Sequence, residues 1–118
     1  MPEAVIVSNP GLSLSISEVD GVTLVQCRGD LMYENSDFLK REVKSKIPDK
    51  GRMILDLSEV TRMDSTGLGA IVAIYLSARS RGCQFNLINL NQQIRNLLAL
   101  SNLLSVFETF GRHGVRMP

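Results

Sequence analysis

The sequence predicts an α/β fold, with a mixed sheet of four to five strands, an N-terminal antiparallel hairpin and three main helices. The first observation behind it is the apolar/polar alternation over 12–19, followed by the Asp-Gly turn signal at 20–21 and a returning strand-like segment at 22–29. The second is that strand-like and helix-like segments then alternate to residue 110. This alternation is typical of parallel strands joined by right-handed crossovers.

The element after the hairpin is a helix with clear boundary signals. Asn35 or Ser36 can cap its start, because a short side chain with an acceptor oxygen satisfies a free backbone N–H there. Apolar residues then recur every four positions on one face, up to about Ile47. Pro48 and Gly51 end the helix.

The second half of the chain supplies further strands and helices. The short apolar segment 52–58 predicts a central strand, and 65–82 has apolar residues at helical spacing. A strand at 83–90, a short helix at 91–103 and a last short strand at 105–110 complete the predicted fold.

The length of 118 residues suits one domain, which we expect at 12–110. Residues 1–11 are expected to form an N-terminal extension or an edge strand. Residues 111–118 are expected to form a flexible C-terminal tail in place of a long final helix, since they contain two glycines and a terminal proline. An apolar strip left uncovered by that helix would suit a second interface, so a homodimer stays open.

Composition argues against several classes of function. The formal net charge of +1 gives no electrostatic case for binding nucleic acid or an anionic membrane. No segment is apolar enough to insert into a bilayer, and the N-terminus lacks the features of a signal peptide, so we expect a cytoplasmic protein. Cys27, Cys83 and His113 are too few and too far apart for a zinc site, and we expect neither a metal nor a cofactor.

The strongest chemical signal is the run Asp-Ser-Thr-Gly-Leu-Gly, which starts at Asp64 directly after an apolar strand. Ser65 does not fit a hydrolase nucleophile, since Met63 stands where the nucleophile elbow needs glycine and the single histidine is His113, near the end. A nucleotide-binding P-loop does not fit either, because Ala70 replaces the required lysine. We therefore expect no enzyme. In the structural interpretation, Asp64 or Ser65 caps the helix and the glycines permit close packing.

The segment ILDLSEVTRMDSTGLGAIV at 54–72 resembles the signature of STAS domains (sulphate transporter and anti-sigma factor antagonist domains). CRGDLMYEN at 27–35 resembles the family's Gly-Glu-Leu segment, and the whole resemblance covers about residues 12–107. It implies the family's small α/β fold and, for a single-domain member, an anti-sigma factor antagonist. Such a protein binds an anti-sigma factor that is itself a serine kinase with a GHKL-type fold. The kinase ends binding by phosphorylating the serine after the motif's aspartate, and a PP2C-type phosphatase reverses this.

Carried onto this chain, the resemblance implies that Ser65 is the phosphoacceptor, with Thr66 as a lesser candidate. It also implies a partner interface at the loop after the second strand and at the first turn of the motif's helix. From the residues alone, two alternatives stay open: Leu31, Met32 or Tyr33 is exposed for the partner, or Leu31 lies in the core and only Tyr33 is exposed. The predicted interface residues are Asp64, Met63, Gly67, Leu68, Leu31, Met32, Tyr33 and Asn35.

One departure from the family concerns this interface. Gly-Asp-Leu-Met at 29–32 stands where the family has Gly-Glu-Leu-Asp, so Met32 holds the usual aspartate position. Any partner contact made by that aspartate is missing here. The departure mildly favours an alternative function, a non-enzymatic STAS subunit or scaffold of a larger complex, such as the partner of a lipid-transport ATPase or a layer of a sensory assembly.

Overall fold

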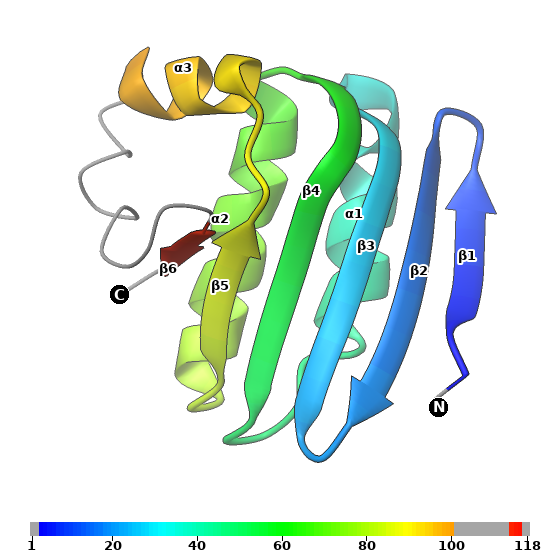
Figure 1. Cartoon of the computed structure of the whole chain (residues 1–118), viewed down its shortest axis with the longest axis vertical. Coiled ribbons are helices and arrows are strands. Elements are labelled where there is room, and N and C mark those ends of the chain that lie inside the picture. Colours follow the sequence, from blue (N-terminus) through cyan, green and yellow to red (C-terminus); the bar gives the residue numbers. More distant parts are fainter. Residues whose placement is uncertain (1–2, 101–113, 117–118) are drawn as a thin grey trace.

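A computed structural model describes residues 3–100 and 114–116 of the chain. Among these residues, six strands form one sheet and three helices accompany it (Figure 1). The expected α/β fold with three main helices is confirmed, and its sheet has six strands in place of the four to five predicted. The strands are β1 (Val5–Asn9), β2 (Leu12–Val19), β3 (Val22–Leu31), β4 (Arg52–Met63), β5 (Gln84–Ile88) and β6 (Gly114–Arg116). The helices are α1 (Tyr33–Lys44), α2 (Ser65–Ser80) and α3 (Gln92–Leu100).

The strands lie in the sheet in the same order as in the chain. β1, β2 and β3 are antiparallel, β3, β4 and β5 are parallel, and β6 is antiparallel to β5. The predicted N-terminal hairpin and parallel later strands are therefore confirmed. β1 forms an edge strand within residues 1–11, and β6 pairs with β5 within a segment that the sequence predicted as a flexible tail. The strand predicted at 105–110 lies outside the described residues.

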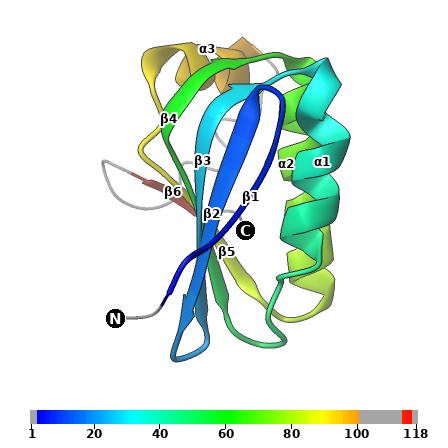
Figure 2. The ribbon, with the colours of Figure 1, turned by 90° about the vertical axis from the view of Figure 1, so that its right-hand side faces the viewer.

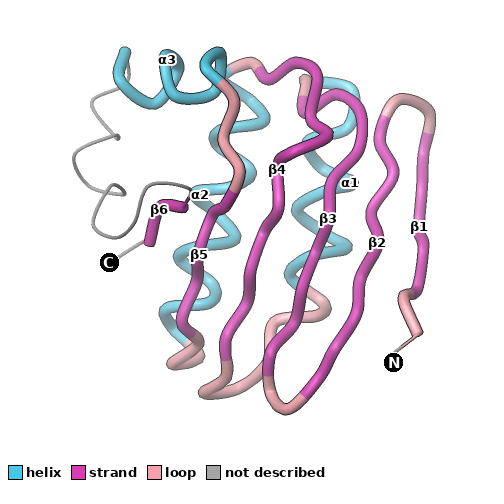
Figure 3. The backbone as a smooth tube through the Cα atoms, in the orientation of Figure 1, coloured by secondary structure: helices cyan, strands magenta, loops and turns pink. Residues whose placement is uncertain are grey.

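Helices α1 and α2 lie side by side on one face of the sheet (Figure 2). Each joins two neighbouring parallel strands, α1 between β3 and β4 and α2 between β4 and β5. The carboxyl ends of these strands therefore point to one edge of the sheet, where both helices begin and where α3 lies (Figure 3). In open α/β sheets, ligands and functional groups gather at this edge.

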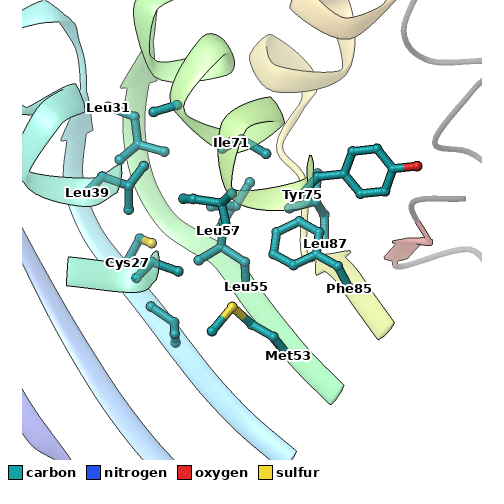
Figure 4. Packing of buried hydrophobic residues seen from close by; sticks show 14 of the residues in the cluster. Cys27, Leu31, Leu39, Met53, Leu55, Leu57, Ile71, Tyr75, Phe85 and Leu87 are labelled. Atoms are coloured by element: carbon teal, nitrogen blue, oxygen red, sulfur yellow. The ribbon is translucent and has the colours of Figure 1, made fainter. Parts of the chain in front are cut away.

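The hydrophobic core lies between the sheet and these two helices. Alternate residues of the strands point toward the helices, since successive side chains of a strand face opposite sides. Figure 4 shows side chains of β3, β4 and β5 meeting those of α1 and α2. Leu31, Leu39, Met53, Leu55 and Leu57 are fully buried there. Removal of this apolar layer from water is the main driving force for the fold.

Two predicted boundaries differ from the structure more than the others. Helix α1 begins at Tyr33, before the predicted cap, and Asn35 lies buried in its first turn, where its Oδ1 accepts the Met32 N–H at 3.0 Å. Asn35 therefore reaches back across the turn instead of capping the helix from outside. Strand β4 continues beyond residue 58, because β3 pairs with it as far as Leu31 opposite Met63.

Candidate functional site

The turn between β4 and α2 is organised by Asp64, the N-cap residue of α2. Asp64 Oδ1 accepts the backbone N–H groups of Thr66 at 2.9 Å and of Gly67 at 3.1 Å. These N–H groups have no partner within the helix, so a side-chain acceptor stabilises its start. The sequence left open whether Asp64 or Ser65 caps the helix, and the structure assigns the cap to Asp64.

The two hydroxyl groups that follow Asp64 differ in their bonding. Ser65 and Thr66 are both exposed at the first turn of α2. The Thr66 hydroxyl donates to Asp64 Oδ1, whereas Ser65 Oγ makes no hydrogen bond with any described residue. Ser65 therefore presents the freer oxygen, at a helix N-terminus where backbone N–H groups and the helix dipole favour negative charge.

Asp64 also reaches the other helix at this edge. Its second oxygen, Oδ2, accepts the backbone N–H of Tyr33 at 3.1 Å, and its own N–H donates to the Leu31 carbonyl at 3.2 Å. Tyr33 is the first residue of α1, and Leu31 is the last residue of β3. The β3–α1 turn and the β4–α2 turn are thus held together through one residue.

The hydrogen bonds to Asp64 decide its charge state. Partial burial opposes ionisation, but bonds from the Thr66 side chain and from the Gly67, Tyr33 and Thr66 backbone outweigh it and lower the pKa of the carboxyl below its ordinary value. Asp64 is therefore an anion at neutral pH, and this charge lies directly beside Ser65.

Asp30, near the end of β3, is bonded to residues of β4. Arg62 Nη2 lies 2.7 Å from Asp30 Oδ2, and the Thr61 hydroxyl donates to Asp30 Oδ1 at 2.6 Å. These two bonds lower the pKa of Asp30 to about 2. The carboxylate that stands near the family's acidic position in the sequence is thus engaged with β4.

Burial divides the residues predicted for a partner interface. Tyr33 is 74% exposed, and Met32 and Asp64 are half-buried. Leu31 lies in the core, which settles the choice that the sequence left open about this side chain. A buried side chain has little surface to offer a partner. The buried residues of the predicted interface therefore hold the exposed ones in position. The buried residues of the prediction are Leu31, Asn35, Met63, Gly67 and Leu68.

The two glycines of the motif have different environments. A Cβ on Gly67 would lie 2.1 Å from the Leu31 carbonyl oxygen, so this glycine lets α2 approach the end of β3. A Cβ on Gly69 would meet nothing within 4 Å, and the residue is exposed. The expectation that both glycines serve internal packing is therefore wrong for Gly69. The spacing of the two glycines could have predicted this difference, because residues two positions apart face different sides of a helix.

Within the described ranges, no group of three or more histidine, cysteine or acidic residues could hold a metal ion. No described helix is long and apolar enough to cross a membrane. The described residues at this edge offer exposed hydroxyl groups, the anchored carboxylates of Asp64 and Asp30, and an exposed aromatic ring.

Known proteins are similar to this chain in sequence. A candidate anti-sigma factor antagonist of Thermotoga maritima is 36% identical over 87 residues, which are 72% of this chain and 77% of that protein. The anti-sigma F factor antagonist of Paenibacillus polymyxa is 25% identical over 101 residues, 84% of this chain and 86% of that protein.

Solved structures of similar proteins have the same fold as this chain. The crystal structure of a candidate anti-sigma factor antagonist from Thermotoga maritima matches with a TM-score of 0.71 and 33% identity, over 79% of this chain and 81% of that one. The Bacillus cell fate determinant SpoIIAA in its phosphorylated form has the same fold, with a TM-score of 0.60 and 17% identity over 76% of this chain and 84% of that one. The family model of the STAS domain matches residues 13–114, and with the site and fold described above this shows that the chain belongs to the STAS domain family.

Proposed function

We propose that this protein is an anti-sigma factor antagonist. It binds an anti-sigma factor that has a GHKL-type serine kinase fold, and phosphorylation of Ser65 switches the binding off. A PP2C-type phosphatase restores it. The observation that carries this proposal is the exposed Ser65 hydroxyl, which is free of hydrogen bonds to described residues, while the neighbouring Thr66 hydroxyl is held by Asp64.

The first turn of α2 suits a phosphorylated serine. In the reaction the γ-phosphoryl group of ATP forms a bond to Ser65 Oγ, its bond to the β-phosphate oxygen breaks, ADP leaves, and the hydroxyl proton passes to the kinase. The product carries about −1.5 to −2 charges at neutral pH. Because the helix N-terminus favours anions, we expect the fold to remain intact.

The same charge opposes binding to a partner. A phosphate dianion trapped in an interface without a cationic partner would lose its hydration, and it would lie beside the Asp64 carboxylate. A loss of about 3 kcal/mol weakens binding more than about a hundredfold. Phosphorylation can therefore end binding without any change in the rest of the fold.

The proposed docking surface combines the exposed residues at the starts of both helices. Met32 and Tyr33 come from α1, and Ser65, Thr66 and Gly69 come from α2, on either side of Asp64. An exposed aromatic ring such as Tyr33 is a frequent anchor of protein interfaces. Gly69 leaves open space in which a partner backbone can come close to the helix.

The relatives support the proposal in two ways. Two proteins that match most of this chain are named as anti-sigma factor antagonists, one of them as a candidate. SpoIIAA, which shares the fold, has been solved in a phosphorylated form. The phosphoacceptor and the kinase fold of the partner are part of the proposal for this chain.

The test uses the purified protein with each GHKL-type serine kinase of the source organism and ATP. We expect mass spectrometry to find phosphate on Ser65 and none on Thr66. Ser65→Ala should bind the kinase constitutively, and Ser65→Glu should bind at least about a hundredfold more weakly. Ser80→Glu is the matched control, since Ser80 is an exposed serine at the other end of α2 and the added charge is the same.

Two results would count against the proposal. One is phosphate on Thr66 alone. The other is equal binding of Ser65→Ala and Ser65→Glu to the same partner, which would point to a permanent STAS subunit or scaffold whose contact ignores Ser65.

A further inference from the structure

Asp64 occupies a special position between the two helices. Among the described residues it is the one side chain that accepts hydrogen bonds from the N-termini of both α1 and α2. Oδ1 serves Thr66 and Gly67 of α2, and Oδ2 serves Tyr33 of α1. The carboxylate therefore joins the two halves of the proposed docking surface.

Helix α1 depends on this bond because its own N-cap residue contributes little. Met32 occupies the N-cap position with extended backbone, and its capping box consists of the Asn35 side chain, which accepts the Met32 N–H at 3.0 Å, and the Met32 thioether, which faces the Asn35 N–H. The Asn35 N–H donates to the Met32 backbone carbonyl at 3.1 Å, and the Tyr33 N–H is satisfied by Asp64. A thioether is a weak acceptor, unlike the carboxylate, amide or hydroxyl groups that usually stand at this position.

Resting on the function proposed above, we propose that Asp64 is a positioning residue that couples the modification of Ser65 to the β3–α1 turn. In the unmodified protein, Asp64 fixes the first residue of α1 and with it the backbone that carries Tyr33. Phosphorylation of Ser65 weakens the Asp64–Tyr33 hydrogen bond and releases that backbone. The switch then changes both halves of the docking surface, although the phosphate is attached to one of them.

Two effects of the phosphate act in this direction. Its acceptor oxygens compete with the Asp64 carboxylate for the free N–H groups at the first turn of α2. Its charge repels the adjacent carboxylate, whose two oxygens are already divided between the donors of α2 and the Tyr33 N–H. The N–H groups of Thr66 and Gly67 remain bonded either to the Asp64 carboxylate or to the phosphate, because both anions lie at the start of α2. The Tyr33 N–H comes from the neighbouring element, so its bond is the one that has no replacement.

The first experiment compares the full-length protein with and without phosphoserine incorporated at position 65, by NMR hydrogen exchange of assigned amides. We expect the Tyr33 amide to exchange about tenfold faster in the phosphorylated protein, and its proton resonance to move upfield. The amide of Leu39, buried in the middle of the same helix, should not change. An unchanged Tyr33 amide in the phosphorylated protein would overturn the proposal.

The second experiment uses Asp64→Asn, which separates the two roles of the side chain. Asparagine is as good an N-cap residue as aspartate, so its oxygen keeps the cap of α2. Its NH2 group then faces the Tyr33 N–H, and two donors cannot bond to each other. We expect a roughly tenfold faster exchange of the Tyr33 amide, with the Gly67 amide as protected as in the unmodified protein. A Tyr33 amide that stays protected in this variant would equally overturn the proposal.

Both experiments work without a partner or a kinase. A protein that fails to bind any anti-sigma factor would contradict the proposed function and leave these amide measurements intact. Conversely, loss of binding on phosphorylation together with an unchanged Tyr33 amide would retain the proposed function and remove the coupling through Asp64.

Discussion

The starts of α1 and α2 lie at the same edge of the sheet, each directly after a parallel strand, and yet they are built differently. Helix α2 carries its own cap, because Asp64 precedes it and binds the N–H groups of Thr66 and Gly67. Helix α1 has Met32 in the corresponding place and takes an acceptor for its first N–H from Asp64. The first N–H groups of α2 are therefore satisfied by the residue that precedes it, whereas α1 takes an acceptor from the neighbouring β4–α2 turn.

The difference explains why the Asp-Ser-Thr-Gly segment contributes more than a local helix start. Asp64 stabilises two helices, and Gly67 lets α2 lie against the carbonyl of Leu31, where β3 ends and the path to α1 begins. The proposed modification of Ser65 would therefore take place next to the residues that hold both helix starts in place. Such contacts would let a modification in one of the two chain segments also affect the other.

Gly67→Ala should have the largest effect, because it breaks the contact between the two starts. The new Cβ would lie 2.1 Å from the Leu31 backbone oxygen, and neither α2 nor β3 can move away without disturbing the core. We expect a loss of about 3 kcal/mol of unfolding free energy, at the upper end of the range for overpacked sites. Urea denaturation monitored by circular dichroism would measure it.

Gly69→Ala is the matched control for that variant, two residues further along the same helix. Its Cβ would meet nothing within 4 Å, and alanine favours the helix over glycine, so we expect a gain of about 1 kcal/mol. Partner binding should nevertheless weaken, since the proposed docking surface includes this position. If the two variants had the same free energy of unfolding, the close approach of Gly67 to Leu31 would not determine the stability of the fold.

Asp64→Ala should follow in size, because it removes an acceptor from both helices. Loss of an N-cap costs about 1 kcal/mol, and an unsatisfied Tyr33 N–H adds roughly another 1 kcal/mol, which gives about 2 kcal/mol in total. Asp64→Asn should lose only about half of this, since asparagine still caps α2. If both variants lost the same free energy in urea denaturation at an unchanged m-value, the bond to Tyr33 would contribute nothing to stability.

The sequence was sufficient wherever the determining contacts are local. The hairpin between β2 and β3 turns at Asp20 and Gly21, which adopt the positive φ values of 52° and 79° that an Asp-Gly pair favours. The start of α2 was predicted to within one residue, since its cap is part of its own segment.

The errors at the start of α1 and at the end of β4 lie where a contact comes from far along the chain. The start of α1 was placed at Asn35 or Ser36, because nothing in its own segment shows that Asp64 will bind the Tyr33 N–H. The strand predicted at 52–58 stopped before the polar end of β4, yet pairing with β3 and the ion pair of Arg62 with Asp30 keep that end extended. Neither partner can be identified from local spacing.

Met32→Ser should give α1 a cap of its own and so remove the difference between the two starts. A serine hydroxyl at the N-cap accepts an N–H of the first turn, and we expect a gain of about 1 kcal/mol in unfolding free energy. In this background, Asp64→Ala should cost less than in the natural protein, because α1 no longer depends on Asp64 alone. Equal costs of Asp64→Ala in the two backgrounds, measured as a double-mutant cycle, would show that the two caps act independently.

Acid should reveal the smallest effect and the one that separates the carboxylates of this edge. The pKa of Asp64 is lowered on folding from an ordinary value of 3.8, so its stabilising contribution is complete above that value and is lost as the pH falls through the lower, folded value. Asp30, with a pKa of about 2, keeps its charge and its bond to Arg62 further into acid. We therefore expect the stability differences of Asp64→Asn and of Asp30→Asn from the natural protein both to shrink as the pH falls below 3.8, and that of Asp30→Asn to go on shrinking down to about pH 2. Parallel urea titrations of the three proteins at several acidic pH values would measure both trends. If the difference for Asp64→Asn stayed constant with pH, the charge of Asp64 would have no part in holding the two helix starts together.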